Sequence, residues 1–151
     1  MLYSHENLDR INFADYIQRL AEELYGSLLI APQRVNLQID ADGVDLSVHR
    51  AIPCGLILNE LLSNAFKYAF PEGHSGGKVV VCFRKEQPDR LTLTVQDNGV
   101  GIPETFDWRK AKSLGLQIVR ILAKQVNGSV ELYRDSGTRF TVTMPSSTGL
   151  T

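Results

Sequence analysis

Four polar side chains lie within the apolar stretch 56–70 at the spacing of one helix face: Glu60, Asn64, Lys67 and Tyr68. At about 100° per residue they share one stripe with Asn64 near its middle. Burying such groups is costly unless something polar meets them. Asn64 offers an oxygen to Mg²⁺, which keeps its waters and phosphates, and Lys67 can reach phosphate as a point charge. The stripe predicts a metal–phosphate site in which Glu60 helps to hold the ion or activates water. A solvated or salt-bridged helix face is the alternative.

A second group of residues with chemical potential is the tight turn 97–103, Asp-Asn-Gly-Val-Gly-Ile-Pro. Asp97 is an acceptor at the end of a predicted buried strand. Gly99 and Gly101 let the backbone come close to a ligand or take a positive φ. Taken alone, Asp-Asn-Gly is an ordinary turn signal, so the turn by itself has a structural explanation.

A third piece, Leu114-Gly115-Leu116, opens a predicted helix whose free N–H groups can face phosphate. Alone, a glycine near a helix start more often serves packing or capping. The order of the pieces is more informative than any one of them. A polar helix stripe is followed by the glycine turn, a cationic linker over 105–112, the glycine-opened helix, and Gly137-Thr138 on the last strand.

Hydrophobic periodicity predicts the elements that must position these residues. We expect helices over 13–26, from about 50 to 70, and from 114 to 126, with strands over 35–39, 44–48, 78–84, 91–96, 130–133 and 138–144. Asn12 is the predicted cap of the first helix and Gly26 its stop. Three helices and about six strands, mostly joined by hairpins, predict a two-layer α/β sandwich with a mixed, mostly antiparallel sheet.

Size and composition describe an ordinary globular chain. With 151 residues, 43% hydrophobic, we expect one domain over 13–145, a lead-in over 1–12 that continues from a missing upstream segment, and a frayed tail over 146–151. A net charge of −1 gives no electrostatic footprint for nucleic acid or an anionic membrane. Cys54 and Cys82 are expected to be buried thiols of a cytoplasmic protein.

Four segments together carry a family resemblance. NELLSNAFKYA (59–69) resembles the N box of the GHKL, or Bergerat-fold, ATP-binding superfamily, and DNGVGIP (97–103) resembles its first glycine box. SLGLQIV (113–119) is similar to a shortened second glycine box, and GTRFTVTMP (137–145) to the closing strand. The match extends over 44–145 and is closest to the catalytic domain of sensor histidine kinases. Glu60 stands where most of these kinases have Asn, which resembles the HWE-like and related subfamilies.

The resemblance implies Mg-ATP as the ligand and gives the helix stripe its roles. Asn64 would ligate Mg²⁺ with Glu60 oriented beside it, so that Glu60, Asn64 and Lys67 form the catalytic set. Lys67 and Tyr68 would contact phosphates or ribose. The second glycine box would cover the phosphates through Gly115 and Leu116.

The resemblance also implies how the base is held. Asp97 would accept the adenine amino group, and Thr138 would support it through water. Gly99, Gly101 and Ile102 would wall the adenine slot and so complete the nucleotide site.

Three features depart from the family pattern. The second glycine box has one glycine where fuller versions have two or three, and a separate phenylalanine box is absent. We therefore expect a short nucleotide lid in which Phe106, Trp108 and Arg109 take its place; an exposed anchor on a loop is the alternative for Trp108. The phospho-acceptor helical hairpin is also missing, since His5 lacks the long helix that should follow it.

The predicted function is therefore transfer of the ATP γ-phosphoryl to a histidine on a dimerisation hairpin outside this chain. The implied partners are that hairpin and a response regulator, with the parent protein a homodimer. Nucleic acid and a membrane are not expected to contact this domain. Three alternatives remain: a free-standing serine kinase of the anti-sigma type, an ATPase of the chaperone, mismatch-repair or topoisomerase kind, and an interaction module that has lost nucleotide binding.

Overall fold

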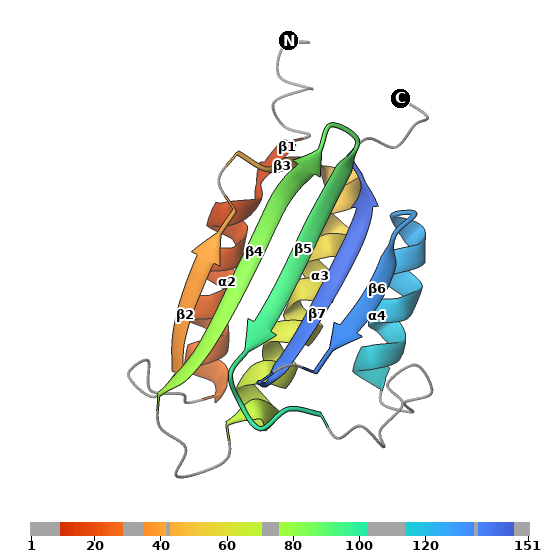
Figure 1. The fold of residues 1–151 in the computed structure, drawn as a ribbon. Helices are drawn as coiled ribbons and strands as arrows, with labels where there is room; N and C mark the ends of the chain where they lie inside the picture. Colours follow the sequence, from red (N-terminus) through yellow and green to blue (C-terminus); the bar gives the residue numbers. More distant parts are fainter. Residues whose placement is uncertain are drawn as a thin grey trace.

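Three helices cover one face of a five-stranded sheet in the computed structural model (Figure 1), which describes residues 10–28, 35–41, 43–70, 76–102, 114–134 and 136–146. The helices are α2 (Phe13–Leu28), α3 (Val48–Asn64) and α4 (Leu114–Gln125), and the π-helical turn η1 (Ala65–Ala69) follows α3. The strands are β1 (Arg10–Asn12), β2 (Val35–Asp40), β3 (Asp45–Ser47), β4 (Gly77–Gln87), β5 (Arg90–Asp97), β6 (Ser129–Tyr133) and β7 (Thr138–Pro145). The predicted two-layer sandwich is confirmed.

The main sheet has the strand order β2-β4-β5-β7-β6. Only β2 and β4 run parallel; the other neighbours are antiparallel, as predicted for a mixed, mostly antiparallel sheet. Strands β1 and β3 form a separate antiparallel pair with Ile11 opposite Leu46. The last three residues of the predicted lead-in 1–12 are thus strand β1, and residues 1–9 lie outside the described residues.

The core lies between the sheet and the helix layer. Alternate residues of β4, such as Val81 and Phe83, are fully buried beneath the helices, because successive side chains of a strand point to opposite faces. From the helix layer, Ile17, Ile57 and Leu62 are equally buried. Each such side chain contributes about 1.5–3 kcal/mol by leaving water, so the sheet is a firm platform for what its ends carry.

The start of α2 is as predicted, but its end is not. The Asn12 side-chain oxygen accepts hydrogen bonds from the backbone N–H groups of Ala14 (3.0 Å) and Asp15 (3.3 Å), which confirms the cap. Gly26 was predicted to stop the helix, which instead continues to Leu28. A single glycine lowers helix stability by only about 1 kcal/mol and need not end a helix. Just before Gly26, the Tyr25 hydroxyl donates a hydrogen bond to the Val35 carbonyl at 2.9 Å.

The helix predicted from about 50 to 70 changes type near its end. Helix α3 begins at Val48 and its α-helical part ends at Asn64, after which the chain forms the π turn η1. The prediction of one helix to 70 was wrong in this respect, because a single wider turn is too short to show in the apolar periodicity. Such π turns are rare and often occur at functional sites. At the other end, buried Arg50 donates a hydrogen bond to the Pro145 carbonyl and ties α3 to β7.

The hairpin of β4 and β5 is longer and tighter than predicted, with only Pro88 and Asp89 between the strands. Ser146, assigned to the frayed tail, donates its N–H to the Asp89 carbonyl and its hydroxyl to the Pro88 carbonyl, each at 2.9 Å. Residues 147–151 lie outside the described residues.

The two cysteines differ in environment. Cys54 is buried beside the Met144 sulfur at 3.6 Å, and burial raises its pKa to about 11. Cys82 was also expected to be buried, but strand alternation places it on the face of the sheet away from Val81, where it is partly exposed. Both thiols are free.

Candidate functional site

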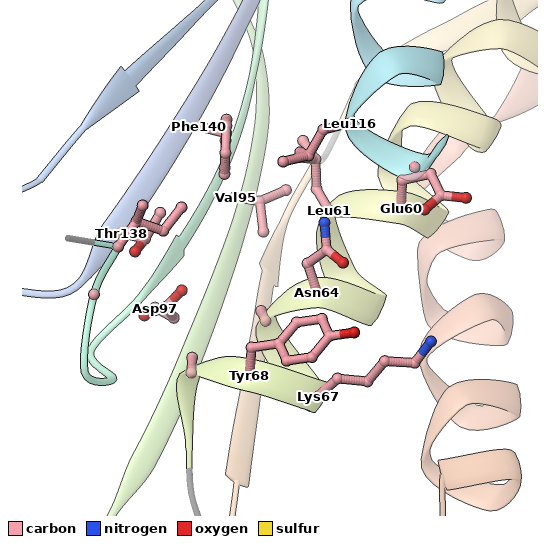
Figure 2. Close-up of a pocket in the computed structure, with 15 residues that line it drawn as sticks. Glu60, Leu61, Asn64, Lys67, Tyr68, Val95, Asp97, Leu116, Thr138 and Phe140 are labelled. Atoms are coloured by element: carbon pink, nitrogen blue, oxygen red, sulfur yellow. The ribbon is translucent and has the colours of Figure 1, made fainter. Parts of the chain in front are cut away.

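A cavity of about 540 Å³ lies between the helix layer and the sheet, at the end where β5 finishes and β7 begins. Its lining includes the predicted site residues except Gly99: Glu60, Asn64, Lys67, Tyr68, Asp97, Gly101, Ile102, Gly115, Leu116 and Thr138. Figure 2 shows that Asp97 and Thr138 face Asn64 and Tyr68 across the opening. The volume is typical of a small-molecule or cofactor site.

One end of the cavity is built on paired strands. Asp97 stands opposite Val79 on one side and Thr138 on the other, and both Asp97 and Thr138 are only 7% exposed. The backbone N–H of Gly99 donates to Asp97 Oδ1 at 2.9 Å. Burial raises the pKa of Asp97, while hydrogen bonds from the backbone of Gly99 and Thr138 act to lower it. This end therefore offers a fixed, largely desolvated acceptor to a ligand N–H group.

Two glycines hold the turn after β5 in place. A Cβ at Gly99 would lie 2.2 Å from the Ala69 carbonyl oxygen, and one at Gly137 would lie 2.1 Å from the Asp97 carbonyl oxygen. The Val100 N–H donates to the same Ala69 oxygen at 2.9 Å. Gly99 was predicted to wall a ligand slot. Its position instead allows the turn to pack on the end of η1. This packing holds Asp97 in place.

Gly101 and Ile102 extend the lining beyond this turn. Gly101 has a φ of +79°, which favours glycine over residues with a side chain, and a Cβ there would lie 3.3 Å from the Gly137 carbonyl oxygen. Ile102 is half-buried and packs against the core, and its carbonyl accepts a hydrogen bond from the Arg134 side chain at 3.1 Å. The positive φ predicted for this glycine-rich turn is thus found at Gly101.

The opposite end is built on helix termini and is more open. Asn64 is the last residue of α3, and Lys67 and Tyr68 belong to η1. Tyr68 is 69% exposed, and Lys67 extends along the rim away from Asp97 (Figure 2). Glu60 lies one turn before Asn64, against the first turn of α4 at Gly115. Side chains that carry an amide, a carboxylate and an ammonium thus line this end of the cavity.

The oxygen donors at this end fit a metal that takes few protein ligands. Asn64 and Glu60 supply an amide and a carboxylate oxygen to the same cavity. Among the described residues, no group of three or more His, Cys, Asp or Glu side chains could enclose an ion. Mg²⁺ satisfies its octahedral shell largely with water and phosphate, so this sparse donor set suits Mg²⁺ bound together with a phosphate ligand.

Apart from Ile102 and Leu116, the apolar residues of the lining were not predicted from the sequence. Val95 and Phe140 are cross-strand partners, two residues from Asp97 and Thr138 and on the same face of the sheet. The period of two along each strand is the signal that identifies them. On the helix side the added liners are Leu61, Ala65 and Ala69. Together these side chains form an apolar slot, which ends at the Asp97 acceptor and suits a flat ring.

Some predictions concern residues that are not described. Phe106, Trp108 and Arg109, expected to replace the nucleotide lid, lie outside the described residues, as does His5. No helix in the described part of the chain is long and apolar enough to cross a membrane.

The cavity has a desolvated acceptor at one end of an apolar slot and a polar end lined by Gly115, an arrangement that suits a nucleotide. Residues 49–148 match the family described as histidine kinase-, DNA gyrase B-, and HSP90-like ATPases. The chain belongs to this ATP-binding family, and the resemblance inferred from its motifs is confirmed.

Named relatives agree with this assignment. The chain is 35% identical over 116 residues to blue-light-activated histidine kinase 2 of Erythrobacter litoralis, covering 75% of this chain and 33% of the relative. It is 31% identical over 142 residues to the sensor histidine kinase PdtaS of Mycobacterium tuberculosis, covering 91% of this chain and 28% of the relative. The chain thus spans about a third of the length of these relatives.

A solved structure shows the same fold. The histidine kinase domain of the blue-light activated histidine kinase from Erythrobacter litoralis superposes with a TM-score of 0.80 at 30% identity, covering 89% of this chain and 65% of that chain. In fold and sequence the chain is an ATP-binding catalytic domain of the sensor histidine kinase type.

Proposed function

We propose that this domain binds ATP together with Mg²⁺ and presents the γ-phosphoryl group to a histidine outside the chain. The single observation that carries the proposal is the two-ended cavity. Buried Asp97 marks the base end, and Asn64 and Lys67 mark the phosphate end. Adenine fits the apolar slot with its amino group donating to the Asp97 carboxylate, which directs the triphosphate toward α3 and α4.

The phosphate end supports binding and orientation. Asn64 would hold Mg²⁺ with Glu60 oriented beside it, and the bound ion would neutralise phosphate charge. Lys67 and Tyr68 would contact phosphate or ribose from η1. Gly115 and Leu116 bring the first turn of α4 over the phosphates. Phosphoryl transfer depends chiefly on such positioning and electrostatic stabilisation, so the domain needs little further chemical machinery.

The reaction that we propose is balanced as follows. The bond between the γ-phosphorus and the β–γ bridging oxygen breaks, and ADP leaves with that electron pair. A P–N bond forms to the histidine imidazole, whose proton passes to solvent. The names of the relatives support histidine over serine as the acceptor.

The parent protein that we infer is a dimeric cytoplasmic sensor kinase, in which the acceptor histidine lies on a dimerisation hairpin and a response regulator receives the phosphoryl group. Within it, residues 13–145 form the catalytic domain. The length of the relatives, about three times that of this chain, supports such additional segments.

Calorimetric titration with a non-hydrolysable ATP analogue tests the proposal. We expect micromolar to submillimolar binding that requires Mg²⁺ and is lost in Asn64→Ala. Asn59→Ala is a matched control, because Asn59 is the same residue type on the same helix but does not line the cavity. Absence of binding by the unmodified protein would refute the proposal. Equal affinity of the protein and Asn64→Ala would remove Asn64 from the site.

A further inference from the structure

Glu60 lies against Gly115 at the end of the cavity opposite Asp97. A Cβ built on Gly115 would lie 2.4 Å from Glu60 Oε2 and 3.2 Å from its carboxyl carbon. The carboxylate of α3 is therefore seated directly against the second residue of α4, in space that only a glycine leaves open. Figure 2 shows Glu60 beside the first turn of α4.

The charge of α4 gives this contact an electrostatic meaning. The unsatisfied N–H groups of a helix N-terminus carry partial positive charge, which acidic side chains commonly offset. The first turn of α4 contains no acidic residue of its own. The Glu60 carboxylate supplies that negative charge from the neighbouring helix. Among the described residues, no ion pair involves Glu60.

This carboxylate lies where the proposed function directs the terminal phosphate, because base binding at Asp97 leaves the triphosphate to extend toward Asn64 and Gly115. Two anions a few ångströms apart in a partly enclosed site repel each other unless a cation lies between them. A free triphosphate is therefore disfavoured at this end, whereas a triphosphate that carries a divalent cation is not.

We propose that Glu60, seated on Gly115, is a charge selector that admits the terminal phosphate of a nucleotide only together with a divalent cation. The inference rests on the proposed function and adds a specificity role for Glu60. In this role Glu60 is a positioning residue that excludes cation-free triphosphate, and Gly115 is the residue that makes room for it.

Affinity measurements with Glu60→Gln test the selector. Glutamine keeps the shape of the side chain and removes its charge. We expect the affinity for the ATP analogue without Mg²⁺ to rise at least about tenfold, since the repulsion is lost, while the affinity with Mg²⁺ changes less than about threefold. Affinity for ADP without Mg²⁺ should rise less than that for the ATP analogue, since ADP lacks the phosphate nearest to Glu60. Glu86→Gln is the matched control, an exposed change of the same kind near the far end of β4.

A second variant displaces the carboxylate without removing it. In Gly115→Ala the new Cβ meets the far end of a flexible side chain, so the carboxylate swings away and the backbone keeps its place. We expect Gly115→Ala, like Glu60→Gln, to raise the affinity for the ATP analogue without Mg²⁺. The double variant should show no greater increase in this affinity than Glu60→Gln alone. A fully additive double variant would contradict the shared mechanism.

The thermal unfolding midpoint tests the contact without any nucleotide. Alanine favours helix over glycine, so Gly115→Ala should raise the midpoint more in a Glu60→Ala background, where no carboxylate must move, than in the unmodified protein. Equal shifts would overturn the proposed contact. Loss of Mg²⁺-dependent affinity in Glu60→Gln, with Mg²⁺-free affinity unchanged, would instead make Glu60 a direct metal ligand and overturn the selector. If the unmodified protein binds no nucleotide, the proposed function and the selector both fail, and unequal midpoint shifts would still establish the contact.

Discussion

The two ends of the cavity are built in opposite ways. The base end rests on β5 and β7, where Asp97 and Thr138 are paired in the ladder and are each 7% exposed. The phosphate end rests on the end of α3, the π turn η1 and the first turn of α4, and Tyr68 there is 69% exposed. A strand paired on both sides resists local opening more than a helix terminus does. Under the proposed function, base selection is therefore a property of the sheet, and phosphate binding is a property of helix ends that can adjust.

The glycine turn joins these two regions. Gly99 packs on Ala69 at the end of η1, and Gly137 packs behind Asp97, so that the turn after β5 is fixed to both layers. We call this glycine turn, with its contacts to Ala69 and Asp97, the seam. A change in the seam should disturb both ends of the cavity, whereas a change at one end of the cavity should leave the other end intact.

The largest effect is expected from Gly99→Ala, which would break the seam itself. The new Cβ would lie 2.2 Å from a backbone oxygen of Ala69, and backbone cannot move aside as a side chain can. We expect a loss of about 2–3 kcal/mol in the free energy of unfolding, measured by urea denaturation. Gly26→Ala is the control, because nothing lies within 4 Å of a Cβ there and alanine should stabilise α2 by up to about 1 kcal/mol. Unchanged stability in Gly99→Ala would show that the turn is not held by this contact.

The next effect concerns base selection at the sheet end. Hypoxanthine presents a carbonyl where adenine presents an amino group, so the Asp97 carboxylate should favour ATP over ITP. In Asp97→Asn we expect ATP to lose about 2 kcal/mol of binding free energy, or about thirtyfold in affinity, while ITP loses much less. Competition titrations give both affinities. Equal losses for the two nucleotides would count against contact between Asp97 and the base.

A smaller effect is expected at the phosphate end. Lys67 is exposed on η1 and would act on phosphate as a point charge. Lys67→Ala should weaken ATP binding by up to about fivefold at low ionic strength, and the difference should fade as KCl approaches 0.5 M because salt screens exposed charges. The Asp97→Asn effect should persist across the same salt series. A salt-independent loss in Lys67→Ala would place its ammonium in a more enclosed position than the rim.

The smallest effect is the pH dependence of stability that Asp97 causes. Burial raises its folded-state pKa above the ordinary value of 3.8, so the folded protein holds this proton more tightly than the unfolded chain. Asp97 should therefore cost no stability below about pH 3.8 and should become progressively destabilising as pH rises from there through its folded-state pKa. Urea denaturation over this pH range should show that the free energy of unfolding of the unmodified protein decreases relative to that of Asp97→Asn as pH rises. A parallel pair of profiles would contradict the raised pKa.

Much of the fold follows from local patterns in the sequence. The alternation of Val35, Leu37 and Ile39 predicted β2, the Asn12 cap predicted the start of α2, and the hairpins followed from short polar turns. The polar stripe around Asn64 and the acceptor Asp97 were also identified in advance, because a polar residue at regular spacing on an apolar element needs a partner. These features depend on residues that are close to one another along the sequence.

The sequence alone determined the helices and strands in outline, the sheet class, the family motifs and the polar residues proposed for the site. Only the tertiary structure decided that α3 ends in a π turn, that Gly99 packs on Ala69, and that Glu60 is seated on Gly115. Each of these depends on which distant backbone lies within a few ångströms. Such proximity is fixed by the packing of whole elements against one another, and the spacing of residues along the chain does not encode it.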